Sequence, residues 1–218
     1  MGKRPIIIYG AGGFGREIAC LINAINEERA EPQWDLLGFV DDNAVVGTKL
    51  RHGEVLGNAD YINNYSSGEV AVAIAVGSAN ALKAIRLKIT NRKAWFPTLI
   101  APDVKFFDIG SVKIGEGNLI TFGCRLSCDV KIGNFNVING CISMGHDVKV
   151  GDFNVLMPET RISGETCVGN GNFFGARSFV AQRLKIGDFT KIAAGSIVLR
   201  STKDGELYMG NPAQRIKK

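Results

Sequence analysis

The chain has 218 residues and a net charge of +5, and 45% of its residues are hydrophobic, which is enough to bury a core and excludes a disordered protein. No apolar stretch reaches the length of about 18 residues that a membrane-spanning helix needs. The five cysteines are odd in number and widely spread, which favours a reduced cytoplasmic protein without a zinc site. The excess positive charge lies entirely in residues 104–218, which indicates an anionic ligand. No run of five like charges occurs, so nucleic acid is not an expected partner.

Residues 1–103 predict a small Rossmann-like α/β domain that binds a nucleotide or nucleotide sugar. A strand of β-formers precedes a turn of the form G-x-G-x-x-G, and an amphipathic helix follows it. In such a turn the backbone amides of Gly10, Gly12 and Gly13 can approach phosphate oxygens. Alternatively, the glycines only permit close packing of strand and helix.

A second strand, 36–40, ends in an acidic pair. The carboxylates of Asp41 and Asp42 can accept hydrogen bonds from a ribose or a base edge, or they form a solvated turn. Residues 70–76 predict a central parallel strand, and a helix follows over 79–91. A last strand is expected at 96–100. The domain is half the size of a full dinucleotide fold, so a mononucleotide-sized ligand is favoured over NAD, and a dehydrogenase is disfavoured.

Residues 104–218 have a different period. An apolar residue recurs every sixth position from Ile114 to Val198, and glycine follows it seven times. A period of six fits a parallel β-helix whose aliphatic residues point inward, and it fits neither an α-helix nor a simple alternating strand. We expect the seven glycines, Gly115, Gly133, Gly145, Gly151, Gly169, Gly175 and Gly187, to mark the corners of the coils.

These repeats, together with the glycine turn, Phe39–Asp42, the Gly145-His146-Asp147 motif and Gly210–Ala213, resemble the bacterial hexapeptide-repeat sugar acyltransferases. That family includes sialic acid O-acetyltransferase-like proteins and UDP-4-amino-sugar N-acetyltransferases. The resemblance implies a left-handed parallel β-helix, acetyl-CoA as acyl donor and a nucleotide-linked or free sugar as acceptor. It also implies a homotrimer with active sites between subunits, and no membrane or metal.

Only two histidines occur, His52 and His146. Acyl transfer from a thioester needs a base that takes a proton from the attacking amine or hydroxyl, and histidine titrates in the right range. The resemblance gives this role to His146, and Asp147 can fix the ring tautomer. Alternatively, His146 is an outward surface residue. His52 lies in a polar Arg-His-Gly segment, and we expect it to be solvated.

Further site residues follow from coil geometry and from the resemblance. If three hexads form one coil, Gly164 lies above His146, where its N–H can stabilise the oxyanion, or where it is only a corner glycine with positive φ. The resemblance places Ala176 and Ala194 beside the pantetheine arm and Asn139 near the acceptor sugar. Basic residues that could meet the phosphates of the coenzyme are Arg177, Arg183, Lys185 and Lys191.

The sequence also departs from the family, because Phe14 and Val155 stand where many members carry histidine. The expected activity is N-acetylation of an amino sugar carried on a nucleotide, of the UDP-4-amino-sugar type, in surface polysaccharide or glycan biosynthesis. O-acetylation of sialic acid or another sugar hydroxyl is the alternative enzyme activity. A nucleotide-binding scaffold is the alternative outside enzymes. A zinc carbonic anhydrase is disfavoured because only one histidine lies in the repeats.

Overall fold

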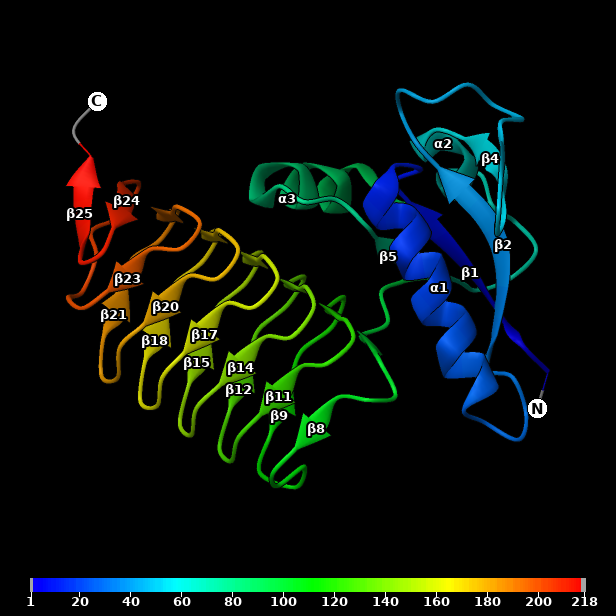
Figure 1. Cartoon of the computed structure of the whole chain (residues 1–218). Helices are drawn as coiled ribbons and strands as arrows, with labels where there is room; N and C mark the ends of the chain where they lie inside the picture. Colours follow the sequence, from blue (N-terminus) through cyan, green and yellow to red (C-terminus); the bar gives the residue numbers. More distant parts are fainter. Residues whose placement is uncertain (1, 217–218) are drawn as a thin grey trace.

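The computed structural model describes residues 2–216 and contains two domains, an α/β domain and a three-sided solenoid (Figure 1). The N-terminus lies at the α/β domain and the C-terminus at the far end of the solenoid. Helix α3 projects from the α/β domain over the upper side of the coils. The predicted fold, a Rossmann-like domain followed by a left-handed parallel β-helix, is confirmed.

The α/β domain is built on a six-stranded sheet with the order β3-β4-β2-β1-β5-β6. Pairing is parallel except between β3 and β4. Every residue of β5 is buried, as expected for a strand covered on both faces. The strands are β1 (Arg4–Tyr9), β2 (Trp34–Val40), β3 (Lys49–Leu50), β4 (Gly53–Gly57), β5 (Val70–Ile74) and β6 (Ala94–Trp95). The helices are α1 (Gly13–Glu27), α2 (Ala59–Asn63) and α3 (Ala79–Lys88).

The expected last strand of this domain, 96–100, is wrong. The strand at its end, β7 (Leu99–Ile100), pairs with β10 and is the first strand of the solenoid. The sheet ends instead at β6, which pairs with β5. The sequence also gave no signal for β3, β4 and α2. The division at residue 103 stays a prediction, although solenoid pairing already begins at Leu99.

Each coil of the solenoid has 18 residues and contributes a two-residue strand to each of three parallel sheets, so that Lys131 pairs with Lys149. Face 1 contains β7 (Leu99–Ile100), β10 (Leu119–Ile120), β13 (Val137–Ile138), β16 (Val155–Leu156), β19 (Phe173–Phe174), β22 (Lys191–Ile192), β24 (Leu207–Gly210) and the antiparallel β25 (Ala213–Ile216). Face 2 contains β8 (Lys105–Phe106), β11 (Arg125–Leu126), β14 (Ser143–Met144), β17 (Arg161–Ile162), β20 (Phe179–Val180) and β23 (Ile197–Val198). Face 3 contains β9 (Lys113–Ile114), β12 (Lys131–Ile132), β15 (Lys149–Val150), β18 (Cys167–Val168) and β21 (Lys185–Ile186).

The predicted inward positions are confirmed. From Ile120 to Val198 every sixth residue is at most 5% exposed, and Ile114 in an outer coil is half-buried. A ladder of buried asparagines adds to this core behind face 1. Asn154 donates from its backbone N and from Nδ2 to Oδ1 of Asn136, and its own Oδ1 accepts from Asn172 in the same way. These bonds satisfy polar groups that burial would otherwise leave unpaired.

The role expected for the seven repeat glycines is wrong. None of them has a φ in the left-handed region, and the corner lies two residues further on, at positions such as Phe135 (φ 54°) and Asp147 (φ 58°). The glycines are instead required by coil stacking. A Cβ on Gly151 would stand 2.5 Å from Oδ1 of Asn170 and 2.8 Å from the carbonyl oxygen of Gly169. The next coil therefore approaches too closely for a side chain.

An aromatic contact joins the two domains. Phe96, between β6 and β7, packs edge-on against Phe135 with 5.2 Å between ring centroids, and Phe135 stacks on Phe153 at 5.3 Å. The guanidinium of Arg86 in α3 lies 4.5 Å above the Phe96 ring. Such ring and cation contacts are each worth about 0.5–1.5 kcal/mol. Helix α3 is thereby fixed at the corner of the solenoid between faces 3 and 1.

Candidate functional site

His146 lies at the corner between faces 2 and 3, two residues after the inward Met144. Its Nδ1 atom is 2.9 Å from Oδ2 of Asp147, and both side chains are more than half exposed. With its proton on Nδ1, the ring donates to this carboxylate and leaves Nε2 as an acceptor. The pair therefore has the geometry of a general base with an orienting carboxylate.

Gly164 lies one coil above His146, as predicted, and the imidazole faces it directly. A Cβ on Gly164 would stand 2.7 Å from Nε2 and 2.9 Å from Cε1 of His146. The reading of Gly164 as a corner glycine is wrong, because positive φ occurs at the next residue, Glu165 (φ 59°). Gly164 is buried, and no acceptor for its N–H lies among residues 2–216. The glycine thus gives the ring of His146 the space that it occupies.

Two charged residues that sequence reasoning had not connected with His146 complete this corner. The backbone N of Glu165 donates to the carbonyl oxygen of His146 (2.8 Å), and the Glu165 carboxylate accepts from Arg183 one coil higher (2.9 Å). The hydrogen bond from Arg183 lowers the pKa of Glu165. A cavity of about 340 Å³ opens beside them, lined by Asp147, Lys149, Glu165 and Cys167. The spacing of 18 residues from Asp147 to Glu165 to Arg183 was the signal for this column.

The other residues assigned by resemblance lie at a different corner. Ala176 and Ala194 follow β19 and β22, and Asn139 follows β13, so all three belong to the corner between faces 1 and 2. Asn139 is half-buried, and its Oδ1 accepts from the Thr121 hydroxyl at 3.2 Å. Within one chain this corner is separate from that of His146 and Gly164.

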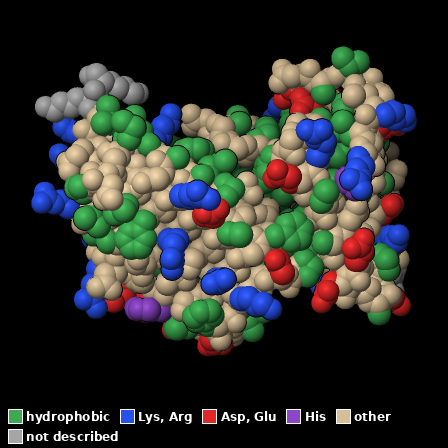
Figure 2. Space-filling view, viewed as in Figure 1, with side chains coloured by type: hydrophobic (Ala, Val, Ile, Leu, Met, Phe, Trp, Pro, Cys, Tyr) green, Lys and Arg blue, Asp and Glu red, His purple; other side chains and the backbone are tan. Residues whose placement is uncertain are grey.

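The four basic residues offered for coenzyme phosphates are also spread over the solenoid. Arg177 pairs with Glu159 and Arg183 with Glu165, whereas Lys185 projects from face 3 and Lys191 from face 1. Figure 2 shows Lys and Arg side chains prevailing over the solenoid in this view, and both signs of charge on the α/β domain. The unequal charge of the two halves is therefore visible on the surface.

The glycine turn lies at the carboxyl end of β1. Gly10 has a φ of 117°, and Gly12 and Gly13 are exposed at the start of α1. The carboxylate of Asp41 closes this turn: its Oδ2 accepts from the Ala11 N–H at 2.9 Å, and its Oδ1 accepts from the Asn43 N–H at 2.8 Å. Asp41 therefore shapes the loop and does not present a free carboxylate.

Asp42 is held by partners within the domain. Its Oδ2 accepts from the Tyr9 hydroxyl (2.8 Å) and from Nζ of Lys88 (2.9 Å). Burial, and then the hydrogen bond to Asp42, raise the pKa of Tyr9 far above its usual range. Partial burial opposes ionisation of Asp42, but the bonds from Lys88 and Tyr9 outweigh it and lower the pKa of Asp42. The predicted acidic pair lies where expected, with both members already engaged.

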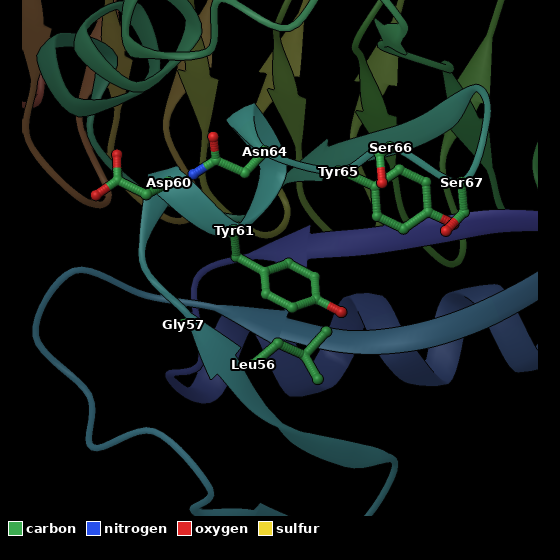
Figure 3. A pocket seen from close by; sticks show the side chains of 8 residues that line it. All are labelled: Leu56, Gly57, Asp60, Tyr61, Asn64, Tyr65, Ser66 and Ser67. Atoms are coloured by element: carbon green, nitrogen blue, oxygen red, sulfur yellow. The ribbon is translucent and has the colours of Figure 1, made fainter.

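A cavity of about 490 Å³ lies next to this acidic pair, between β4 and α2 (Figure 3). The Tyr61 ring extends above Leu56, with Tyr65, Ser66 and Ser67 toward one end and Asp60 pointing away. It borders the acidic tip, because the Asp41 N–H donates to the carbonyl oxygen of Gly57 at 2.9 Å. None of the residues predicted from sequence lines this cavity.

Three remaining expectations concern histidine and metals. Phe14 is half-buried against the core and Val155 is fully buried, so a histidine at position 155 would be buried in this chain. His52 is not simply solvated, since it is half-buried with Nδ1 3.0 Å from Nδ2 of Asn23 in α1. Between residues 2 and 216 no group of three His, Cys, Asp or Glu side chains could hold a metal ion. Over the same range no helix is long and apolar enough to cross a bilayer.

A glycine turn, an acidic second-strand tip and a following three-sided solenoid are now placed together. Residues 5–92 match the PglD N-terminal domain family. A search of curated proteins gave no match. The PglD-type domain is therefore the part of the chain identified from sequence, and the solenoid is compared through solved structures.

Solved structures match both domains together. The acetyltransferase domain of PglB from Neisseria gonorrhoeae, in complex with acetyl coenzyme A, is 23% identical with a TM-score of 0.88, over 99% of this chain and 100% of that chain. PerB from Caulobacter crescentus, in complex with CoA and GDP-perosamine, is 22% identical with a TM-score of 0.88, over 100% and 98%. WeeI from Acinetobacter baumannii is 25% identical with a TM-score of 0.82, over 98% and 100%. The resemblance to sugar acyltransferases built from a PglD-type domain and a hexapeptide solenoid is confirmed.

Proposed function

We propose that this chain transfers the acetyl group of acetyl-CoA to the amine of a sugar carried on a nucleotide, with His146 as general base. The observation that carries the proposal is the His146–Asp147 pair, whose Nε2 edge faces Gly164. The neighbours support the substrate classes, because PglB is described with acetyl coenzyme A and PerB with CoA and GDP-perosamine. The predicted UDP-4-amino-sugar acceptor, a role in glycan biosynthesis and a cytoplasmic location remain part of this proposal.

The proposed chemistry follows from the tautomer. Asp147 holds the proton of His146 on Nδ1, and Nε2 takes the proton of the sugar amine as the amine nitrogen attacks the thioester carbonyl. The carbon–sulfur bond of the tetrahedral intermediate then breaks and the CoA thiolate leaves, taking up a proton. The oxyanion formed at the carbonyl is assigned to the N–H of Gly164. The same base serves a sugar hydroxyl, which keeps O-acetylation as the second candidate activity.

We further propose that the active form is a homotrimer with sites between copies. The support is the division of the site over two corners: His146 and Gly164 at one, and Ala176, Ala194 and Asn139 at another. A rotationally symmetric ring of three prisms brings one corner of each copy against a different corner of the next. Backbone amides near Ala176 and Ala194 would then hold the pantetheine arm for the His146 of a neighbouring copy, and Asn139 would lie near the acceptor.

The test is thiol release from acetyl-CoA with a panel of UDP-, GDP- and dTDP-amino sugars and free sialic acid. We expect His146→Ala to lose most turnover and to keep coenzyme binding, whereas a nucleotide-binding scaffold would not respond to this change. A mixture of His146→Ala and Ala176→Trp chains, refolded together, should regain about a quarter of the sites if each site is shared by two copies. No CoA release with any acceptor, together with no CoA binding, would disprove the activity.

A further inference from the structure

A groove between the two domains has a composition that the residues discussed so far do not explain. One part, of about 360 Å³, is lined by Gly77 to Asn80 at the start of α3 and by Gly171, Phe173, Phe189 and Lys191 of the solenoid. An adjoining part, of about 320 Å³, lies between α3 and the Phe153–Phe189 corner and shares Ala79, Gly171 and Phe189 with the first. The groove therefore runs from the α/β domain to the solenoid of the same chain.

The α/β side of this groove is the place where open sheets bind ligands. Strand β1 lies between β2 and β5, so the chain reverses its direction of winding between β1 and β5. Ligands of such sheets bind outside the carboxyl ends of the strands at this reversal. The loops there are the glycine turn after β1 and the segment from Gly77 to Asn80 after β5, and the two strands approach so closely that a Cβ on Gly10 would stand 2.6 Å from the Ala75 carbonyl oxygen.

The solenoid side supplies an exposed aromatic ring. At the corner between faces 3 and 1, the left-handed position is Phe135, Phe153 and Phe189 in three coils and Gly171 in the coil between the last two. Phe135 and Phe153 stack on each other, whereas Phe189 leans over Gly171, where a Cβ would stand 2.6 Å from its Cδ1. Phe189 is 50% exposed and lines both parts of the groove. A large exposed aromatic face in a groove is a platform for a planar ring.

The charges divide the groove. Lys191, exposed on face 1, has no ion-pair partner among residues 2–216 and lies in the part that holds Ser78 and Asn80. The other part holds Lys83 with Asp152 and Asp188, whose Oδ1 atoms accept from the preceding coil. Carboxylates repel phosphate, so an anionic group is favoured on the Lys191 side and an uncharged ring against Phe189.

We propose that this groove binds a nucleoside diphosphate, with the base on Phe189 and the diphosphate beside Lys191. The proposal rests on the proposed function, which supplies two molecules with this chemistry, the nucleotide-linked sugar and coenzyme A. Phe189 and Lys191 then belong to the site although they come from the solenoid, and the PglD-type domain provides only one wall. Lys191 acts as a counter-charge and takes no part in proton transfer.

The experiment is isothermal titration calorimetry of the full chain with UDP, GDP, dTDP and CoA. We expect Phe189→Ala to weaken binding of the groove's ligand by about 5- to 150-fold, the effect of losing one base–aromatic stacking contact. Phe189→Tyr should restore the affinity, and Lys191→Gln should weaken it and reduce its salt dependence. Controls are Phe107→Ala, an exposed phenylalanine of the first coil, and Lys113→Gln on face 3.

The arms separate the two sources. Weakened binding of UDP, GDP or dTDP with unchanged CoA binding assigns the groove to the acceptor, and the reverse assigns it to the coenzyme. Wild-type affinity for all four ligands in folded Phe189→Ala and Lys191→Gln would overturn the proposal, even if acetyl transfer were found. Loss of nucleotide binding in these variants without acetyl transfer to any sugar would leave the groove assignment standing and remove the proposed activity.

Discussion

Replacing Gly164 by alanine adds one methyl group at the most crowded point of the catalytic corner. The new Cβ would stand 2.7 Å from Nε2, 2.9 Å from Cε1 and 3.1 Å from Cδ2 of His146, and ordinary contacts begin at 3.4 Å. The ring must therefore move by about 0.7 Å or rotate away. Its side chain is 54% exposed, so rotation into solvent is the easier response, and it breaks the 2.9 Å contact with Asp147.

We expect Gly164→Ala to lose most of the general-base contribution, about 10²- to 10⁴-fold in kcat, or about 2.7–5.4 kcal/mol. The unfolding free energy should change by no more than about 0.5 kcal/mol, as for other surface changes. Thiol release from acetyl-CoA measures the first quantity and urea unfolding the second. Gly110→Ala is the matched control, because its Cβ would meet only Asp108 Oδ1 at 3.4 Å. Folded Gly164→Ala with wild-type kcat would refute the steric argument.

Three further predictions concern stability and reactivity. Asn154→Ala leaves the Asn172 donors of the buried ladder without their acceptor, and urea unfolding should show a loss of about 1–3 kcal/mol, whereas a neutral result would mean that water replaces the amide. Because the pKa of Tyr9 is raised in the folded state, the unfolded chain loses the tyrosine proton first, so stability should fall above about pH 10. Tyr9→Phe should lack this part of the decline, and an identical pH dependence would contradict the assignment. Burial raises the pKa of Cys124 to about 12, so a disulfide reagent at pH 8 should modify the exposed Cys20 and Cys141 and reach Cys124 only after unfolding; rapid reaction of Cys124 in the folded chain would be inconsistent with this burial.

The sequence predicted the solenoid well because its core depends on one local rule. An aliphatic residue every sixth position is sufficient to define three faces, and Ile120, Leu156 and Ile192 are fully buried as expected. The glycines were located correctly but explained wrongly. Their cause is the approach of the next coil, such as Gly169 toward Gly151, and this is a contact between residues far apart in sequence. The position of α3 over the solenoid depends on Arg86, Phe96 and Phe135, which no local pattern connects.

The candidate site was predicted in its residues but not in their arrangement. A coil of 18 residues means that only positions a whole number of coils apart share a corner, as His146 and Gly164 do. Ala176 is not a whole number of coils from His146, so this arithmetic already assigned the two to different corners. One chain thus carries a base at one corner and the expected coenzyme contacts at another. A complete site then requires either a second copy of the chain or a different set of coenzyme contacts, and the mixed-chain experiment separates these two possibilities.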